Sequence, residues 1–152
     1  MANTQAMATS FKGELLNAYH NFSAANPAHT LNTADAFKAA LYLASATMGA
    51  ASTAYTPTNE VSGTNYTAGG VTTGAWNAPT TSGTTGFTTP TGSITYTTVT
   101  LTTAFDAVLI YNSTQTNRAV SVHTFGSQTV TAGTFTLTMP ANAAATALIR
   151  LA

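Results

Sequence analysis

The chain has very little charge. Only 5% of its 152 residues are charged, and the formal net charge is +0. An ordinary soluble domain carries about 25% charged residues. A net charge near zero favours association, because little electrostatic repulsion keeps molecules apart. The scarcity of charge therefore indicates a protein that packs against neighbours, although composition alone does not identify the assembly.

The sequence also lacks any cluster of basic residues. Lys12, Lys38, Arg118 and Arg150 are scattered along the chain. Nucleic-acid binding requires clustered Lys and Arg to displace counterions, so no nucleic-acid partner is expected. No apolar run approaches the roughly 18 residues that span a bilayer, so no membrane partner is expected. The first residues show neither the basic nor the apolar region of a secretory signal, and none is expected.

Cysteine is absent, which excludes disulfides and thiolate metal sites. His20, His29 and His123 lack a His or carboxylate partner at ligand spacing, so we expect no metal and no cofactor. Asp106 and His123 with a serine would make a triad, and Glu60 with Asp106 a carboxylate pair. The sequence has no Gly-x-Ser-x-Gly elbow and only four carboxylates. We therefore expect a non-enzymatic protein.

Threonine takes the place of charge, at roughly one residue in five. Its hydroxyl forms hydrogen bonds without the cost of desolvating an ion. The hydrophobic content of 44% is sufficient for a core, and 152 residues fit a single domain. We expect a mobile N-terminal arm over residues 1–9 and one mainly-β domain over residues 10–152.

Two segments before residue 50 carry secondary-structure signals. Ser10 is a plausible N-cap, and apolar residues at helical spacing after it predict a short amphipathic helix over residues 11–21. Residues 36–46 are ambiguous, because their alanines favour a helix while their alternation favours a strand.

The second half of the chain has β character. Alternation of Phe135 and Leu137 with threonines predicts one buried face and one threonine face. Residues 78–92 are predicted as a low-complexity loop. Strands are predicted at 94–101, 107–111, 119–125 and 147–151, and turns at 112–114 and 126–127. The predicted fold is mainly β, an antiparallel β-sandwich or barrel, jelly-roll-like or Ig-like, with a short N-terminal helix.

Some residues have competing interpretations. Glu60 lies among turn residues, so we expect its carboxylate to accept backbone N–H bonds, and we expect positive φ at Gly69–Gly70. Aromatic residues are common at interface centres, which makes Phe11, Tyr19, Tyr66 and Trp76 candidate interface residues. Trp76 fits a core equally well, and the helix face with Phe11 and Tyr19 fits the domain's own sheet as well as a neighbour.

Several segments resemble a family of tailed-bacteriophage virion structural proteins. The most specific is TAYTPTNEVSGTNYTAGG at residues 53–70. The others are SFKGELLNAYHNF, AFKAALYLASATM, DAVLIYNSTQTNRAVSVHTFG and GTFTLTMPANAAATALIRLA. The resemblance covers most of the chain except residues 78–92, and it favours a strand at 36–46.

The resemblance implies a virion component made in the cytoplasm of a bacterial host. The first hypothesis is a capsid decoration (cement) protein on the capsid surface. Its partners would be the major capsid protein and further copies of itself, with a trimer favoured. The second is a tail or head–tail joining protein. The third is a carbohydrate- or receptor-binding module, which would require an exposed aromatic platform built from Tyr55, Tyr66 and Trp76.

Overall fold

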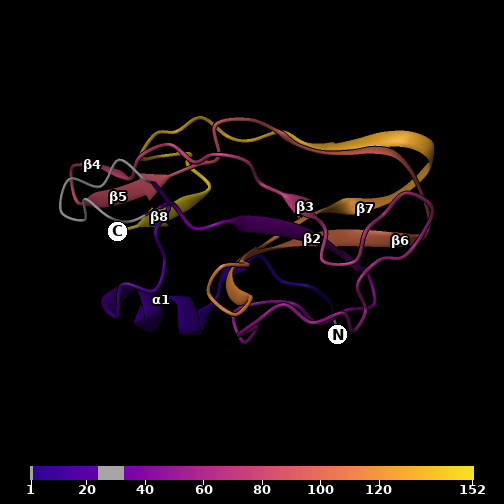
Figure 1. Cartoon of the computed structure of the whole chain (residues 1–152), viewed down its shortest axis with the longest axis horizontal. Coiled ribbons are helices and arrows are strands. Elements are labelled where there is room, and N and C mark those ends of the chain that lie inside the picture. The colour runs from indigo at the N-terminus through magenta and orange to yellow at the C-terminus, as the bar shows by residue number, and fades with distance from the viewer. Residues whose placement is uncertain (1, 24–32) are drawn as a thin grey trace.

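The computed structural model describes residues 2–23 and 33–152. Within them the chain forms one short helix near the N-terminus and two antiparallel sheets (Figure 1). The large sheet has the order β1-β7-β6-β2-β3 and the small sheet the order β4-β5-β8. The elements are β1 (Ala6–Met7), α1 (Thr9–Leu16), β2 (Phe37–Leu43), β3 (Val71–Thr72), β4 (Thr80–Ser82), β5 (Thr85–Thr88), β6 (Ile94–Asn112), β7 (Arg118–Leu137) and β8 (Ile149–Leu151). The predicted mainly-β, sandwich-like fold with one short N-terminal helix is confirmed, and the large sheet stays open at β1 and β3.

The long hairpin of β6 and β7 supplies both layers of the sandwich. Its register shifts four times between Tyr96 and Ala107. Such bulges bend a strand, and here the hairpin folds back over itself (Figure 1). We call residues 105–112 and 118–124 the covered half, since they lie between β2 and β1. Residues 94–104 and 125–137 form the distal half, which makes the other layer.

Aromatic side chains fill the space between the two halves. The Phe135 ring lies 5.0 Å from Phe105 and 5.4 Å from Phe125, measured between ring centroids. The hydroxyl of Tyr96 donates a hydrogen bond to the Ala39 carbonyl, at 2.8 Å, and so ties the distal half to β2. Phe105 is fully buried, and Tyr96 is 2% exposed. The bend therefore encloses the core.

The N-terminal segment is part of the large sheet and does not extend from the domain as an arm. Ala6 and Met7 pair with Val122 and Ser121 of β7. Asn3 is buried, and its Nδ2 donates to Asp106 Oδ1 at 2.6 Å. These partners are more than a hundred residues away in the sequence, which is why the small polar residues at 1–9 suggested mobility.

Helix α1 begins and ends earlier than predicted. It covers Thr9–Leu16 with Ala8 as N-cap, so Ser10 lies inside the first turn. It ends where Ala18 takes φ 56° and the Tyr19 N–H bonds back to the Glu14 carbonyl. The predicted extension to residue 21 is wrong because this left-handed residue turns the chain away from the helix axis.

Residues 36–46 contain strand β2, which settles the ambiguity in favour of a strand. β2 lies between β6 and β3, and most of its residues are buried on both faces. A strand covered on both faces loses clean alternation and becomes apolar along its length. Its alanines fit because a small side chain leaves room for the segments that pack on both faces of the strand.

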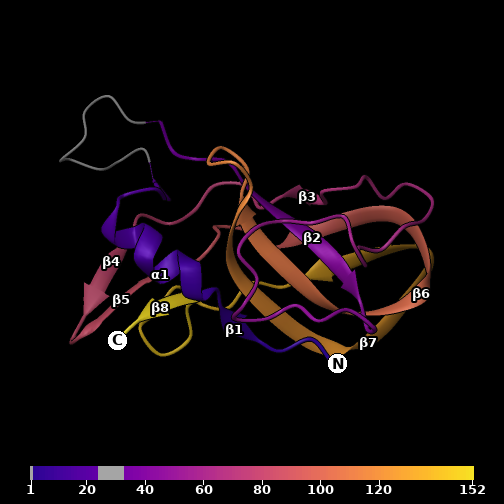
Figure 2. The same ribbon diagram turned by 90° about the horizontal axis from the view of Figure 1, so that it is seen from below.

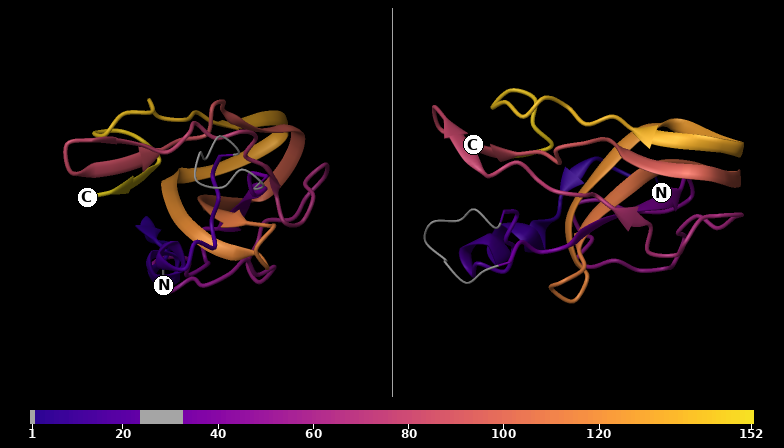
Figure 3. Two further views of the ribbon diagram at one scale, coloured as in Figure 1. Left: turned by 60° about the vertical axis from the view of Figure 1, so that its left-hand side comes forward. Right: turned by 45° about the horizontal axis from the view of Figure 1, so that its top comes forward.

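Residues 78–92 are not a loop. They hold the hairpin of β4 and β5, whose turn has Gly83 at φ 59°, and β5 pairs with β8. This small sheet projects at the end of the molecule opposite the bend (Figure 3). Because β8 supplies the third strand from the far end of the chain, the local composition gave no sign of it. The expected strand at 147–151 is confirmed as β8.

The predicted strands of the second half merge into longer ones. β6 contains both 94–101 and 107–111, and β7 continues through Gly126–Ser127, which were expected to end a strand. The turn expected at 112–114 is present after Asn112. Residues 102–106 and 126–134 bend the strands and do not interrupt them.

Candidate functional site

Two of the four residues predicted for an interface lie in the chain's own core. Phe11 is fully buried, and Trp76 is 7% exposed, with its Nε1 donating to Thr73 Oγ1 at 2.9 Å. Both join an aromatic cluster around Phe22, at 6.2 Å and 4.8 Å between ring centroids. The structure therefore supports the core interpretation of Trp76 and the packing of Phe11 on the chain's own sheets.

Tyr19 and Tyr66 have different surroundings. Tyr19 is 41% exposed, and the Arg118 guanidinium lies 4.4 Å from its ring centroid. Tyr66 is half-buried, stacks on Tyr96, and donates its hydroxyl to Glu60 Oε1 at 2.7 Å. Of the four predicted residues, only Tyr19 offers a large exposed surface.

Glu60 organises the loop before β3. Its carboxylate accepts hydrogen bonds from the hydroxyls of Tyr55 and Tyr66, both at 2.7 Å, and from the Gly69 N–H at 2.8 Å. Burial, together with the hydrogen bond to Glu60, raises the pKa of the Tyr66 phenol. Gly69 has φ 88° and Gly70 φ 69°, as expected for this turn. The prediction that Glu60 accepts a backbone N–H bond is confirmed, and the tyrosine donors are additional.

These contacts also bear on the aromatic platform that a carbohydrate-binding module would need. Tyr55 stacks on Tyr111 with ring centroids 4.9 Å apart, while Tyr66 faces Glu60 and Tyr96. Trp76 is buried. The three rings proposed for that platform therefore serve internal packing.

A second polar cluster joins α1 to the hairpin turn. Arg118 Nη1 and His20 Nε2 each lie 2.7 Å from a different carboxylate oxygen of Glu14. His20 Nδ1 lies 3.1 Å from Asn112 Nδ2, which fits a neutral ring that donates from Nε2 and accepts at Nδ1. Burial lowers the pKa of His20, against the opposing effect of its hydrogen bond to Glu14. Sequence reasoning missed this cluster because its members lie about a hundred residues apart.

The distal half presents a surface that we call the threonine face. It consists of Thr95, Thr97, Thr134 and Thr136, together with Thr138 directly after β7, all exposed. Thr95 stands directly opposite Thr136, and the intervening Tyr96 and Phe135 point to the core. No acidic or basic residue occurs in residues 94–104 or 124–139. The predicted threonine face is exposed, and Phe135 and Leu137 on the opposite face are half-buried and pack against the core.

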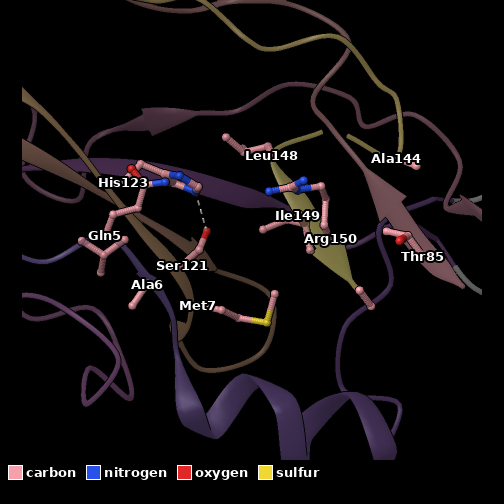
Figure 4. Close-up of a pocket in the computed structure, with 12 residues that line it drawn as sticks. Gln5, Ala6, Met7, Thr85, Ser121, His123, Ala144, Leu148, Ile149 and Arg150 are labelled. Carbon is pink, nitrogen blue, oxygen red and sulfur yellow. Dashed lines mark hydrogen bonds between the residues drawn. The ribbon is translucent and has the colours of Figure 1, made fainter. Parts of the chain in front are cut away.

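A cleft of about 390 Å³ lies between β1, β7 and β8. Figure 4 shows Arg150 of β8 reaching toward Ser121 and His123 of β7, with Met7 below them. Ser121 Oγ lies 2.9 Å from His123 Nε2. Burial lowers the pKa of His123 to about 4, so the ring is neutral at pH 7. The cleft combines a neutral His–Ser pair with one permanent cation.

The residues considered for catalysis have the following hydrogen-bond partners among the described residues. Asp106 accepts from Asn3, Glu60 accepts from the tyrosines, and His123 lies within hydrogen-bond distance of Ser121. Within residues 2–23 and 33–152, no three His, Asp or Glu side chains group to hold a metal ion. His29 lies outside the described residues. The cleft can bind through hydrogen bonds and charge, but the third member of a triad is not beside its Ser–His pair.

Comparison with protein-family models, with curated proteins and with solved structures finds no match. In the part of the chain that the structure describes, no helix is long and apolar enough to cross a membrane.

Proposed function

We propose that this chain is a non-enzymatic structural protein of a phage virion, and specifically a capsid decoration protein that binds across neighbouring major capsid subunits. The observation that supports it best is the threonine face, an exposed β surface on a stretch of chain without acidic or basic residues. The resemblance of several segments to virion proteins supports the same proposal.

The threonine face suits tight contact between subunits. Threonine is stiff at χ1, so it loses little side-chain entropy when a neighbour covers it. Its hydroxyls can exchange water for partner groups, and no ion has to be desolvated. A standard interface buries about 800 Å² on each partner. Many copies with modest contacts of this kind would together stabilise a shell.

The test is binding to purified phage shells with and without packaged DNA. We expect the wild-type chain to cosediment saturably with mature shells. We expect the Thr95→Lys and Thr136→Lys variants to lose at least about tenfold in affinity, since each buries an unpaired charge in the contact. Thr58→Lys, in an exposed loop away from the threonine face, is the matched control and should bind like the wild type.

A cryo-EM reconstruction of the particle then locates the chain. Density at capsomer junctions in high copy number supports decoration. A ring of few copies at the tail or vertex would instead assign the chain to the tail or the head–tail joint. Absence of saturable binding together with absence from the particle would reject both structural roles.

A further inference from the structure

The edge strands of the two sheets, β1 and β8, both contribute to the cleft of Figure 4. β1 is the outer strand of the large sheet and β8 the outer strand of the small sheet, so each has a strand neighbour on one side only among the described residues. The cleft is lined by Gln5–Met7 on one side and by Leu148–Arg150 on the other. In Figure 2, β1 and β8 again lie close together, next to α1. The cleft thus lies between the edge strand β8 and the wall formed by β1 and β7.

The cleft continues past β8 toward the helix. A second cavity of about 550 Å³ shares Met7, Arg150 and Ala152 with the first and is completed by α1. Its wall is largely apolar, with Leu16 90% exposed and Leu151 42% exposed. Lys12 of α1 also lines it. Together the two cavities form what we call the β8 groove, with apolar walls and two cations.

The cations of the β8 groove have no acidic partner in the described chain. Arg150 Nη1 donates to the Ala145 carbonyl at 2.7 Å, and no acidic side chain lines either cavity. The chain's carboxylates have partners elsewhere: Glu14 binds Arg118, Asp35 binds Asn112, Glu60 binds the two tyrosines and Asp106 binds Asn3. The groove therefore holds two cationic side chains and no acidic side chain.

We propose that the β8 groove binds an extended peptide segment of a partner protein, with a carboxylate of that segment on Arg150 and an apolar side chain against Leu16 and Leu151. Main-chain hydrogen bonds to the free edge of β8 would give affinity, and the side-chain contacts would give specificity, as in other strand-addition complexes. The segment would lie along β8, facing β1 and β7. The site is distinct from the threonine face and stands whether or not the chain decorates a shell.

The experiment is an NMR titration of the full chain with two acetylated and amidated pentapeptides. One is Thr-Val-Asp-Val-Thr, and the other has Asn in place of Asp. With the Asp peptide we expect saturable amide shifts confined to residues 5–7, 12–16, 121–123 and 148–152, with a Kd of about 1 mM. We expect the Asn peptide to bind about fivefold more weakly, because it lacks the charge-assisted bond to Arg150.

Three variants test whether Arg150 causes the preference for the Asp peptide. Arg150→Gln should remove the preference for the Asp peptide, while Arg150→Lys should keep most of it. Lys38→Gln on β2 removes one positive charge away from the groove and should leave the preference unchanged. Spectra without peptide report whether each variant is folded.

Three results would overturn the proposal. They are an equal affinity for both peptides, an Asp preference that survives in folded Arg150→Gln, and the absence of saturable shifts at residues 148–152. Shifts in the same residues that grow with protein concentration alone would mean that a second copy of the chain fills the groove, which also rejects the partner peptide. None of these results bears on shell binding, so the two proposals fail separately.

Discussion

The covered and distal halves of the β6–β7 hairpin belong to the same two strands but have different environments. In the covered half, residues 107–111 are all buried, and the side chains of Arg118 and Asp106 bond neighbouring segments to it. In the distal half only one face is covered, and the other is threonine without charge. Both strands run through the two environments without a break. Their side chains are apolar on the faces that other segments cover and are threonine on the face that stays exposed.

The difference between the covered and distal halves should have its largest effect on stability at core residues. Leu109 of the covered half is fully buried, whereas Leu137 of the distal half is half-buried. We expect Leu109→Ala to lower the free energy of unfolding by about 3 kcal/mol and Leu137→Ala by about 1 kcal/mol. Urea denaturation of both variants measures the difference. Equal losses would mean that both halves are covered alike, for example by a second copy.

A similar loss of unfolding free energy is expected at Gly70, where the loop before β3 passes close to β2. Gly70 has φ 69°, and a Cβ added there would overlap the carbonyl of Ala39. Gly74 has φ 73° but nothing within 4 Å of an added Cβ. Gly70→Ala should cost about 3 kcal/mol, and its control Gly74→Ala about 1 kcal/mol, in the same denaturation assay. Equal costs would show that backbone strain alone determines the effect.

His123, at the boundary between the halves, should make stability depend on pH. Its pKa is lowered by burial to about 4 in the folded chain, below the ordinary value of 6.5. The unfolded chain therefore binds more protons as the pH falls, so stability decreases from pH 6.5 to about pH 4 and is fully present above that range. We expect a loss of about 2 kcal/mol across the range from this residue. His123→Gln should reduce the slope, leaving the contribution of His20, and an unchanged slope would contradict the assignment.

The smallest effect is expected at the tip of the covered half. Arg118 bonds Glu14 at 2.7 Å and covers the Tyr19 ring, but its side chain remains one-third exposed. Arg118→Gln should lower the free energy of unfolding by about 1 kcal/mol. High salt should lower the free energy of unfolding of the wild type toward that of the variant, because salt screens exposed ion pairs. A loss that is independent of salt would assign the effect to packing on Tyr19.

The parts of the fold that were predictable are those with local signals. Alternation identified the face that Phe135 shares with Leu137, and the turn residues around Glu60 and Gly69 indicated a polar turn. The β1 pairing, the pairing of β5 with β8 and the bond from Arg118 to Glu14 all depend on partners far along the chain. No local pattern encodes such partners, so small polar residues suggested mobility where the structure has strands.

The candidate sites divide in the same way. The threonine face was predicted from alternation alone. The β8 groove was not, because it forms between the first residues and the last ones, and Arg150 was recognised only as one of four scattered cations. Phe11 and Trp76 have the residue types of interface anchors, and only their surroundings show that they fill the core.

The pairing of the first residues with β7 has a consequence for biosynthesis. Asn3 contacts a residue 103 positions later and Glu14 one 104 positions later. At about 5–20 residues per second, a ribosome takes on the order of 5–20 s to make that stretch. During this interval α1 and β1 have emerged without the strand they pack on. The contacts of the N-terminal segment therefore form only after residues 106–122 have been synthesised.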